Sequence, residues 1–315
     1  MVSLLDTVDQ RTNLVGENRL ELLLFQLQNR QLFALNVFKV KEVVKLPHLN
    51  KMPNSHPKVS GVANIRGQSI PVINLRDAIG LRPIATDEEC NLIITEYNRT
   101  IQGFLVGKVD RIVNMTWGEI MHPPSSVGRN HYLTAITKLK KEGREELVEI
   151  IDVEKVLAEI IEYDASISAG ILDEAIVDKL VGVKILHADD SSTARTQVEA
   201  TLAPLGIEII SAENGLQALE ILKSWIAQGK CVEDEILMLI TDAEMPVMDG
   251  YKLTSEVRAD PAMADLHIVL NTSLSGSFNQ AMVEKVGCNK LLSKFQPDRL
   301  VEVVQDKLKQ KLDIK

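Results

Sequence analysis

Five side chains that could carry chemistry stand directly after apolar stretches in the second half of the chain. Asp189 and Asp190 follow KILHA, Asp242 follows EILMLIT, Thr272 ends HIVLNT, and Lys294 follows KLLS. Polar groups that follow the buried strands of a parallel sheet meet at its carboxyl edge, where ligands bind. The spacing therefore predicts that three carboxylates, a hydroxyl and an ammonium group share one site.

Such a set of groups can accept a phosphoryl group. Two carboxylates about 4 Å apart repel each other by about 4 kcal/mol at an effective dielectric constant near 20, so the three acids need a cation. Magnesium is the expected ion, because it binds a few carboxylates together with waters and a phosphate. Asp242 can then attack phosphorus, while Lys294 neutralises the phosphoryl oxygens and the Thr272 hydroxyl donates to one of them.

Each of these residues also has an ordinary structural interpretation. Asp-Asp-Ser-Ser before a helix is a common N-cap sequence, Thr272 could cap a turn, and a single lysine such as Lys294 is usually solvated. Asp242 is harder to explain in this way, because a charge at the end of an apolar strand needs a partner. His187 has no second His or Cys at metal-binding spacing, so we interpret it as a strand residue. The joint placement at four strand ends favours the functional interpretation.

Alternating strands and helices must position these groups. Five apolar runs (VKILHAD, IEIISAE, EILMLIT, HIVLNT and KLLSKF) alternate with helical patterns at 193–205, 216–227, 251–259, 278–286 and 298–309. Five successive β-α units predict an α/β domain in which helices cover both faces of a parallel five-stranded sheet.

The motifs in this half resemble the response-regulator receiver family over residues 182–312. They are the acidic pair at 189–190, TDAEMPVMDG at 241–250, NTS around Thr272 and SK at Lys294. The resemblance implies a flavodoxin-like (βα)5 fold with Asp242 as phosphoacceptor, and it implies Asp190 and Asp242 as direct magnesium ligands. Asp189 would support the ion through water and Glu244 through its backbone carbonyl. Thr272 and Lys294 match the switch hydroxyl and the phosphate-binding lysine.

Two positions depart from the receiver pattern. The lysine of this family is usually followed by a proline, often in the cis form, but Phe295 follows Lys294 here, and a cis bond before a residue other than proline costs about 3 kcal/mol or more. The position three before the lysine is often an aromatic residue that rotates on activation, and here it is Leu291. Both departures affect how phosphorylation would be read out.

The first half predicts a different architecture. Short apolar runs such as LELLLFQL, QLFALNV, VSGVANI, SIPVINL, NLIITEY and TIQGFLV are separated by turn residues, and LVEIIDVEKVLAEII is typical of a strand that passes into a helix. Such spacing is typical of small antiparallel barrels or sandwiches. Residues 1–163 contain no phosphate-binding glycine loop and no metalloprotease or serine-hydrolase motif, so we expect no catalysis there.

GVANIRGQSIPVINLRDAIG and LNVFKVKEVVKL resemble the CheW family of chemotaxis coupling domains, over residues 17–163. The resemblance implies an all-β domain of paired small β-barrels that binds a receptor tip or a kinase regulatory domain. By this resemblance Val40, Glu42, Val43 and Arg66 are the candidate contacts, and arginine is favoured at interfaces. The alternative is that the two valines are core residues while Glu42 and Arg66 form a solvated pair.

Composition fits two globular domains. The chain has 315 residues, 45% of them apolar, and no apolar run approaches the roughly 20 residues that cross a bilayer. Residues 1–163 contain 20 Lys and Arg against 20 Asp and Glu, so the remaining 15 and 24 carry the whole net charge of -9. This acidity argues against a nucleic-acid surface. We expect a coupling domain at 1–163, a linker at 164–181 and a receiver at 182–315.

A coupling domain followed by a receiver is the arrangement of the CheV family of chemotaxis adaptors. The resemblance implies a cytoplasmic protein without membrane insertion, located at receptor arrays on the inner membrane, whose partners are methyl-accepting chemoreceptors and the CheA histidine kinase. We hypothesise that phosphorylation of Asp242 regulates this coupling and that the chain is not an enzyme. Two alternatives are a phosphate sink for the kinase and a magnesium-dependent phosphohydrolase with Glu244 as acid/base.

Overall fold

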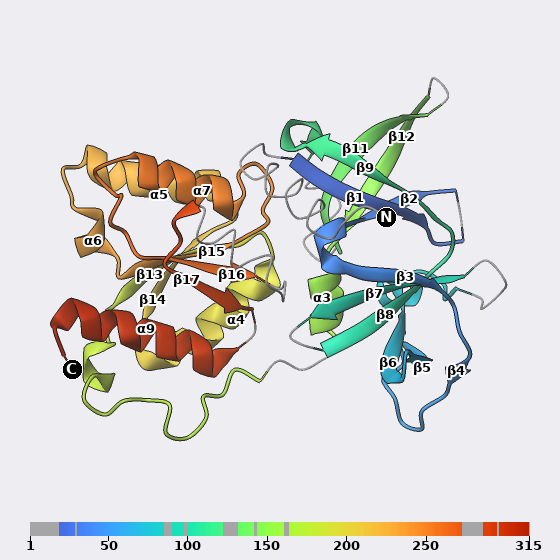
Figure 1. The fold of residues 1–315 in the computed structure, drawn as a ribbon, viewed down its shortest axis with the longest axis horizontal. Helices are drawn as coiled ribbons and strands as arrows, with labels where there is room; N and C mark the ends of the chain where they lie inside the picture. Colours follow the sequence, from blue (N-terminus) through green and yellow to red (C-terminus); the bar gives the residue numbers. More distant parts are fainter. Residues whose placement is uncertain are drawn as a thin grey trace. The chain divides into compact units, whose positions relative to one another are not determined.

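The computed structural model describes residues 19–28, 30–84, 90–97, 100–121, 132–141, 144–160, 164–272, 286–294 and 296–314. These form two compact units, an N-terminal unit over Arg19–Glu162 and a C-terminal unit that includes Tyr163–Lys315 (Figure 1). Of the helix expected at 278–286 only Val286 is described, and Phe295 lies outside the described residues. Within the described ranges, no helix is both long and apolar enough to cross a bilayer.

The N-terminal unit contains two six-stranded sheets. In order across the first sheet, the strands are β10 (Ile120–Met121), β11 (Leu133–Lys141), β12 (Arg144–Ile151), β2 (Leu32–Asn36), β1 (Arg19–Gln26) and β9 (Val109–Thr116). The second sheet consists of β3 (Val40–Lys45), β7 (Asn91–Tyr97), β8 (Thr100–Val106), β6 (Gln68–Asn74), β5 (Val59–Ile65) and β4 (Leu49–Asn50). The all-β prediction is confirmed.

Each sheet curls back on itself. Its two edge strands follow one another in the chain: residues 46–48 join β3 to β4, and the short helix η2 (Trp117–Glu119) joins β9 to β10. Because such a link spans at most about 14 Å, the two edges of each sheet lie near each other, as they do in a small barrel. The buried faces carry large apolar side chains, including Leu22, Leu24 and Phe25 of β1, none of which is exposed.

Local sequence explains the ends of the short helices in this unit. The Asp152 carboxylate accepts a hydrogen bond from Lys155 N at 3.0 Å and so begins α3 (Val153–Ala158), which confirms the predicted passage from strand to helix. Asn74 does the same for α2 (Leu75–Ala78), because its side chain accepts from Asp77 N. The sequence patterns missed β11, whose second half, KLKK, lacks apolar alternation.

The C-terminal unit contains one parallel sheet. Its strands follow the order β14 (Glu208–Ala212), β13 (Lys184–Ala188), β15 (Met238–Asp242), β16 (Ile268–Thr272) and β17 (Lys290–Ser293). Figure 1 shows α5 (Gly215–Ala227) and α7 (Gly250–Ala259) on one side of this sheet, and α4 (Ser192–Leu202) and α9 (Pro297–Leu312) on the other. A short helix, α6 (Val232–Glu235), was not expected. The predicted parallel five-stranded α/β fold is confirmed.

Residues 164–180, which we call the strap, precede β13 and belong to the C-terminal unit. They run through extended and turn conformations and end in the short helix η4 (Val177–Lys179). Leu180 is fully buried in the core beneath α4 and α9, and Ile167, Ile171 and Leu172 pack against the same core. The segment that sequence patterns indicate as a linker thus lies against this unit along most of its length.

Candidate functional site

The parallel register places the candidate residues at one edge of the C-terminal sheet. Asp242 of β15 pairs with Asn271 of β16, and Thr272 pairs with Ser293 of β17, one residue before Lys294. Asp189 directly follows β13, which pairs with β15. Because all these strands run in the same direction, their carboxyl ends lie together.

Lys294 lies between two of the three acids. Its Nζ is 2.8 Å from Asp189 Oδ2 and 2.9 Å from Asp242 Oδ2, and all three side chains are at most 5% exposed. One carboxylate oxygen from each of Asp189, Asp190 and Asp242 lies within 4.8 Å of the others. Among the described residues, this is the one group of three or more potential ligands that could hold a metal ion.

Backbone donors hold the two buried carboxylates in place. Asp189 Oδ1 accepts from Ser191 N at 2.9 Å, and Asp242 Oδ1 accepts from Ala243 N at 2.7 Å. Lys294 N donates to Thr272 O at 2.9 Å, which ties the end of β17 to the end of β16. Each carboxylate therefore has one oxygen on the backbone and one on the ammonium group of Lys294.

Gly250 is required by close packing at this site. A Cβ atom built on it would lie 2.0 Å from the carbonyl oxygen of Asp242, a distance that no side chain tolerates. Gly250 N donates to Ala243 O at 3.1 Å, and α7 begins at this glycine with Asp249 as its N-cap. The DG pair thus allows α7 to start against the end of β15.

Sequence reasoning missed one cation of the site, Arg195. Its guanidinium donates from Nη1 to Asp189 O at 2.5 Å, and Nη2 lies 3.5 Å from Glu213 Oε1. The signal available in the sequence was the position of Arg195 in the first turns of α4, which begins just after the acidic pair. Arg195 adds positive charge behind the carboxylate cluster.

His187 lies in β13 and is completely buried, in agreement with its interpretation as a strand residue. Its Nε2 is 3.9 Å from Asp189 Oδ2, beyond hydrogen-bond distance. Burial, followed by the charges of Lys294 and Arg195, lowers the pKa of His187 to about 3. The imidazole is therefore neutral at physiological pH.

The remaining candidates of this half lie near Asp242 in the sequence or at the neighbouring strand ends. Thr272 is 2% exposed at the end of β16. Leu291, which stands where the receiver pattern often has an aromatic residue, packs together with Tyr251 and Cys288 against the buried pair Ala243 and Leu270. Glu244 is two residues beyond Asp242, and burial followed by the charges of Glu244 and Asp242 raises the pKa of Tyr251.

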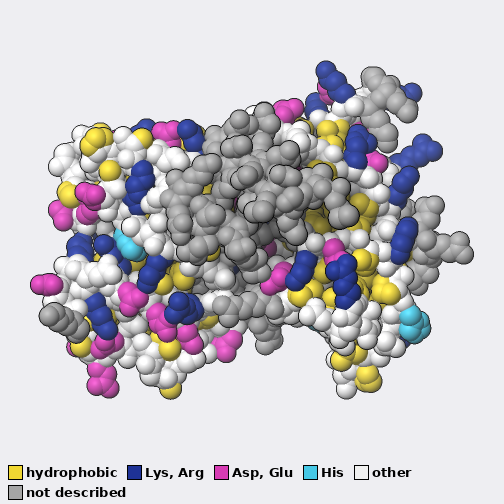
Figure 2. Space-filling model, viewed as in Figure 1, with side chains coloured by type: hydrophobic (Ala, Val, Ile, Leu, Met, Phe, Trp, Pro, Cys, Tyr) yellow, Lys and Arg dark blue, Asp and Glu magenta, His cyan; other side chains and the backbone are white. Residues whose placement is uncertain are grey.

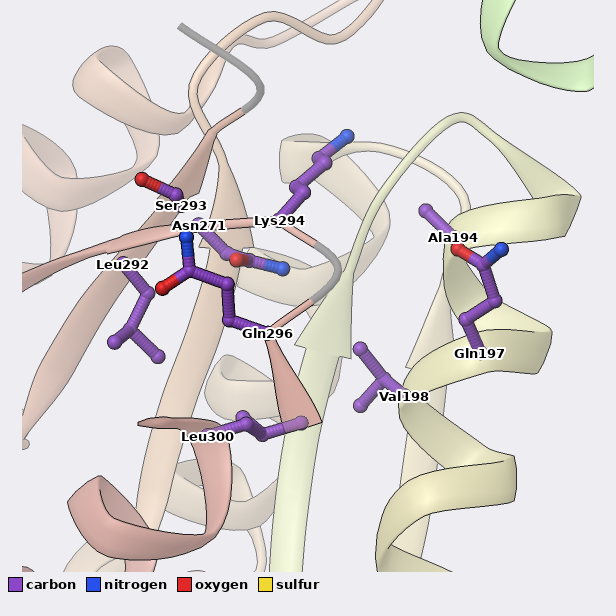
Figure 3. A pocket seen from close by; sticks show the side chains of 9 residues that line it. All are labelled: Ala194, Gln197, Val198, Asn271, Leu292, Ser293, Lys294, Gln296 and Leu300. Atoms are coloured by element: carbon purple, nitrogen blue, oxygen red, sulfur yellow. The ribbon is translucent and has the colours of Figure 1, made fainter. Parts of the chain in front are cut away.

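A small cavity with both polar and apolar walls lies beside Lys294. It has a volume of about 20 Å³, and its walls include Gln197, Asn271 and Gln296, with Val198 and Leu300 as apolar neighbours (Figure 3). In Figure 3 the Gln197 carboxamide comes from α4 and that of Gln296 from the turn before α9. Gln197 Oε1 and Gln296 Nε2 are buried and have no hydrogen-bond partner among the described residues.

The structure places the four candidate contacts of the N-terminal unit around β3, at an edge of its sheet. Arg66 Nη2 lies 2.8 Å from Glu42 Oε2, with the Arg66 side chain 80% exposed, so the two form the solvated pair considered above. Val43 is 38% exposed and Val40 is half-buried, so neither is a core residue. Strand alternation directs Glu42 and Val43 to opposite faces, and the four residues do not share one face.

The surface shows where apolar and charged side chains gather. Figure 2 shows exposed apolar side chains over the N-terminal unit, and the large ones known to be exposed there include Val43, Met52, Ile112, Met121 and Leu147. Over the C-terminal unit, Lys and Arg alternate with Asp and Glu on the visible face. The described residues visible on that face form no basic stripe of the kind that binds a phosphate backbone.

Comparison with known proteins agrees with this division. The CheW-like domain model matches residues 21–160 and the response regulator receiver domain model matches residues 185–305. Chemotaxis protein CheV1 of Helicobacter pylori is 31% identical over 330 residues, with coverage of 97% of this chain and 98% of that protein. Chemotaxis protein CheV3 of the same species is 29% identical over 278 residues, with 87% of each chain covered.

A third relative matches the C-terminal unit alone. The chemotaxis protein CheY homolog of Campylobacter jejuni is 34% identical over 128 residues, which cover 40% of this chain and 92% of that protein. The buried acid cluster with its lysine therefore lies in a receiver domain, and the two-sheet unit before it is a CheW-like domain. The chain has both domains in this order, and it is 31% identical to CheV1 over nearly the full length of both proteins. It therefore belongs to the CheV family of chemotaxis proteins.

Proposed function

We propose that this protein is a chemotaxis adaptor whose CheW-like domain joins chemoreceptors to the CheA histidine kinase, and that phosphorylation of Asp242 regulates this coupling. The observation that carries the proposal is the contact of Lys294 Nζ with both Asp189 and Asp242, because it places a nucleophilic carboxylate beside a cation at a strand end. This arrangement suits a group that accepts phosphoryl, since the ammonium can neutralise the incoming oxygens.

The residues define the chemistry of the step. A carboxylate oxygen of Asp242 attacks phosphorus, so that a P–O bond forms while the P–N bond of a phosphohistidine breaks and the imidazole nitrogen keeps the electron pair. Lys294 transfers its contact from Asp242 to the phosphoryl oxygens. We assign the donation of a hydrogen bond to one of these oxygens to the Thr272 hydroxyl.

The donor set at this site fits magnesium. The three carboxylates, with oxygens within 4.8 Å of one another, carry three negative charges, whereas Lys294 and Arg195 supply two positive charges. Magnesium could balance the remaining negative charge, and it prefers oxygen ligands such as these. Asp190 and Asp242 would bind it directly, with Asp189 acting through water and Glu244 through its backbone carbonyl. When bound, magnesium supplies neutralising charge for the added phosphate.

The partner contacts and location follow from the CheW-like domain. We assign Val40, Glu42, Val43 and Arg66 to contacts with receptor or kinase, because Arg66 and Val43 are exposed and Glu42 pairs with Arg66 at the surface. We place the protein in the cytoplasm beside receptor arrays. We keep the proposed boundaries of a coupling domain at 1–163, a linker at 164–181 and a receiver at 182–315.

Phosphoryl transfer is the first test. Purified CheA labelled on its histidine is mixed with the full chain and magnesium, using wild type and Asp242→Ala. We expect label on wild type alone. Equal labelling of both proteins would place the acceptor elsewhere, and no labelling of either would remove receiver chemistry from the proposal and leave only the scaffold.

Regulation is tested separately by measuring the affinity of the full chain for CheA with and without acetyl phosphate. We expect the affinity to change in wild type and to stay constant in Asp242→Ala. Leu291 favours one competing function, a phosphate sink, since a leucine at this position has no ring to rotate. A sink predicts rapid labelling and loss of phosphate with the same CheA affinity in both states.

A further inference from the structure

The strap, residues 164–180, is held along one stripe of α9. Asp298, Gln305 and Lys309 of α9 all contact it, and their spacing of seven and four residues places them on the same face of the helix. α9 begins at Pro297, three positions after Lys294. The helix that holds the strap is therefore joined to the phosphate-binding lysine by a single short turn.

The first half of the strap is held by polar contacts and by three apolar side chains, those of Ile167, Ile171 and Leu172, which are only partly buried. Ser168 N donates to Asp298 Oδ1 at 2.8 Å and Ser168 Oγ donates to Asp298 Oδ2 at 2.6 Å, both at an exposed position. The buried Gln305 side chain accepts from Asp173 N at 2.7 Å and donates to Ile171 O at 2.9 Å. Lys309 forms an ion pair with Asp173.

The second half is held by apolar burial. Ile176 and Leu180 are not exposed at all, and Leu180 is part of the core that also contains Val301 and Val304 of α9. Ser168, in contrast, is exposed. A segment with exposed hydrogen bonds and only partly buried apolar side chains opens locally at a lower free energy than one anchored by completely buried side chains. Residues 164–173 can thus leave α9 while residues 176–180 stay in place.

We propose that phosphorylation of Asp242 releases residues 164–173 from α9, so that the strap carries the state of the acceptor to the chain between the two domains. This inference rests on the proposed function, since it needs Asp242 to be the acceptor. The new phosphoryl group brings a charge of about -1.5 to -2 and takes over the ammonium of Lys294. α9 begins three positions after the lysine, and a shift of its first turn moves Asp298 away from Ser168.

Release changes the length of the tether between the domains. Ten residues that lie along α9 become free chain, which adds up to about 35 Å of reach. The last described residue of the N-terminal unit, Ile160, is only four positions before Asp164, so the freed segment directly extends the connection. When one domain is bound to its partner, the length of the tether sets the effective concentration of the other domain there. A longer tether therefore changes this concentration without any new contact.

Hydrogen exchange in the full chain tests release, with magnesium and beryllium fluoride as the phosphoryl analogue. We expect amide exchange in 164–173 to accelerate by about 5-fold or more, at the lower end of typical coupling between sites, while 176–180 stays protected. Asp242→Ala should show no acceleration. Unchanged exchange in a wild-type protein that binds the analogue would overturn the inference. Failure of wild type to bind the analogue would instead overturn the proposed function.

Reciprocity gives a second test. If the analogue loosens the strap, then loosening the strap by mutation must tighten binding of the analogue, by at most the same factor. Asp298→Ala removes both acceptors of Ser168, and we expect it to bind beryllium fluoride up to about 5-fold more tightly than wild type, from the same coupling. Asp306→Ala is the matched control, because it lies on α9 and pairs with Lys290 at 2.9 Å instead of with the strap. Equal affinity in wild type and both variants would refute the linkage.

Discussion

Lys294 Nζ lies 2.9 Å from Asp242 Oδ2, and the same ammonium lies 2.8 Å from Asp189 Oδ2. One lysine thus forms two buried ion pairs at an edge where three carboxylates gather. Removal of one partner from a buried ionic group costs more than the pair itself contributes, because the remaining charges stay desolvated. Lys294 therefore stabilises the folded receiver.

The first prediction concerns this lysine. We expect Lys294→Met to lower the free energy of unfolding of the receiver by about 3–5 kcal/mol without magnesium, because the acids then repel one another in a buried site. Magnesium should restore part of the loss in the variant. Urea unfolding with and without magnesium measures both effects.

Lys290→Met is the matched control for Lys294→Met. Lys290 pairs with Asp306 at 2.9 Å, but both side chains are about half exposed. Exposed pairs contribute about 1 kcal/mol or less. A similar loss in the free energy of unfolding of the two variants would show that the buried ion pairs of Lys294 contribute no more than an exposed pair.

Sequence patterns predicted that the side chains of the receiver site would lie together, because each of them stands at the end of a strand that the apolar runs make recognisable. Each of Asp189, Asp242, Thr272 and Lys294 stands at the end of an apolar run, and the parallel topology that brings these ends together is dictated by the alternation of strands and helices. The candidate partner contacts stay a prediction, because Arg66, in the turn between β5 and β6, pairs with Glu42 of β3 while Val43 faces the other way.

Other features escaped prediction because they depend on tertiary contacts. The small residues and weak periodicity of the strap are typical of a linker. They do not show that the Gln305 side chain, far along the chain, forms hydrogen bonds with the backbone of Ile171 and Asp173. The guanidinium of Arg195 donates to a backbone carbonyl, and such a contact has no motif of side chains by which it could be predicted. The cavity could not be predicted either, because Gln197 and Gln296, whose carboxamides line it, are far apart in sequence.

A second prediction follows from the packing at Gly250. Because a Cβ there would lie 2.0 Å from Asp242 O, Gly250→Ala must displace either the end of β15 or the start of α7. We expect a loss of about 3 kcal/mol or more in the free energy of unfolding and a slower transfer of phosphate to Asp242. Gly229→Ala is the control: its φ is +75° and its Cβ would meet nothing within 4 Å, so about 1 kcal/mol is expected. Equal losses would contradict the steric argument.

Val247 carries backbone strain beside the site. Its φ is +69°, in the left-handed region that a β-branched residue rarely adopts, and its side chain is 39% exposed, so little burial is lost on substitution. Asparagine tolerates this conformation, and we expect Val247→Asn to raise the free energy of unfolding by about 1 kcal/mol. Val181→Asn, at a 69% exposed position, should change it by less than about 0.5 kcal/mol. Thermal unfolding distinguishes the two, and a destabilised Val247→Asn would show that the valine is not strained.

The cavity beside Lys294 leads to a fourth prediction. A volume of about 20 Å³ suffices for one water, which could donate to Gln197 Oε1 and accept from Gln296 Nε2. We expect a crystal structure to show an ordered water there and Gln197→Met to cost about 1–2 kcal/mol, because one partner of that water is lost. Thr201→Val removes a buried hydroxyl from the same helix that donates to Gln197 O at 2.9 Å and does not line the cavity, which makes it the matched control. A Gln197→Met variant as stable as wild type would mean that the cavity is dry.

The last prediction concerns the pH dependence of receiver stability. Partial burial, followed by the charges of Lys307, Lys290 and Arg258, lowers the pKa of His267 to about 4 from an ordinary value of 6.5. As the pH falls, His267 is therefore protonated near pH 6.5 in the unfolded chain but only near pH 4 in the folded domain. Stability from this group is complete above pH 6.5 and is lost as the pH falls through that window.

His267→Gln tests this dependence, since glutamine does not titrate. Between pH 7 and pH 5 we expect wild type to lose about 1 kcal/mol more than the variant, a figure reduced from the full shift because His267 is partly solvated. Urea unfolding followed by the fluorescence of Trp225, in a Trp117→Phe background, reports on the receiver alone. Parallel stability curves for the two proteins would show that His267 is protonated as easily in the folded domain as in the unfolded chain.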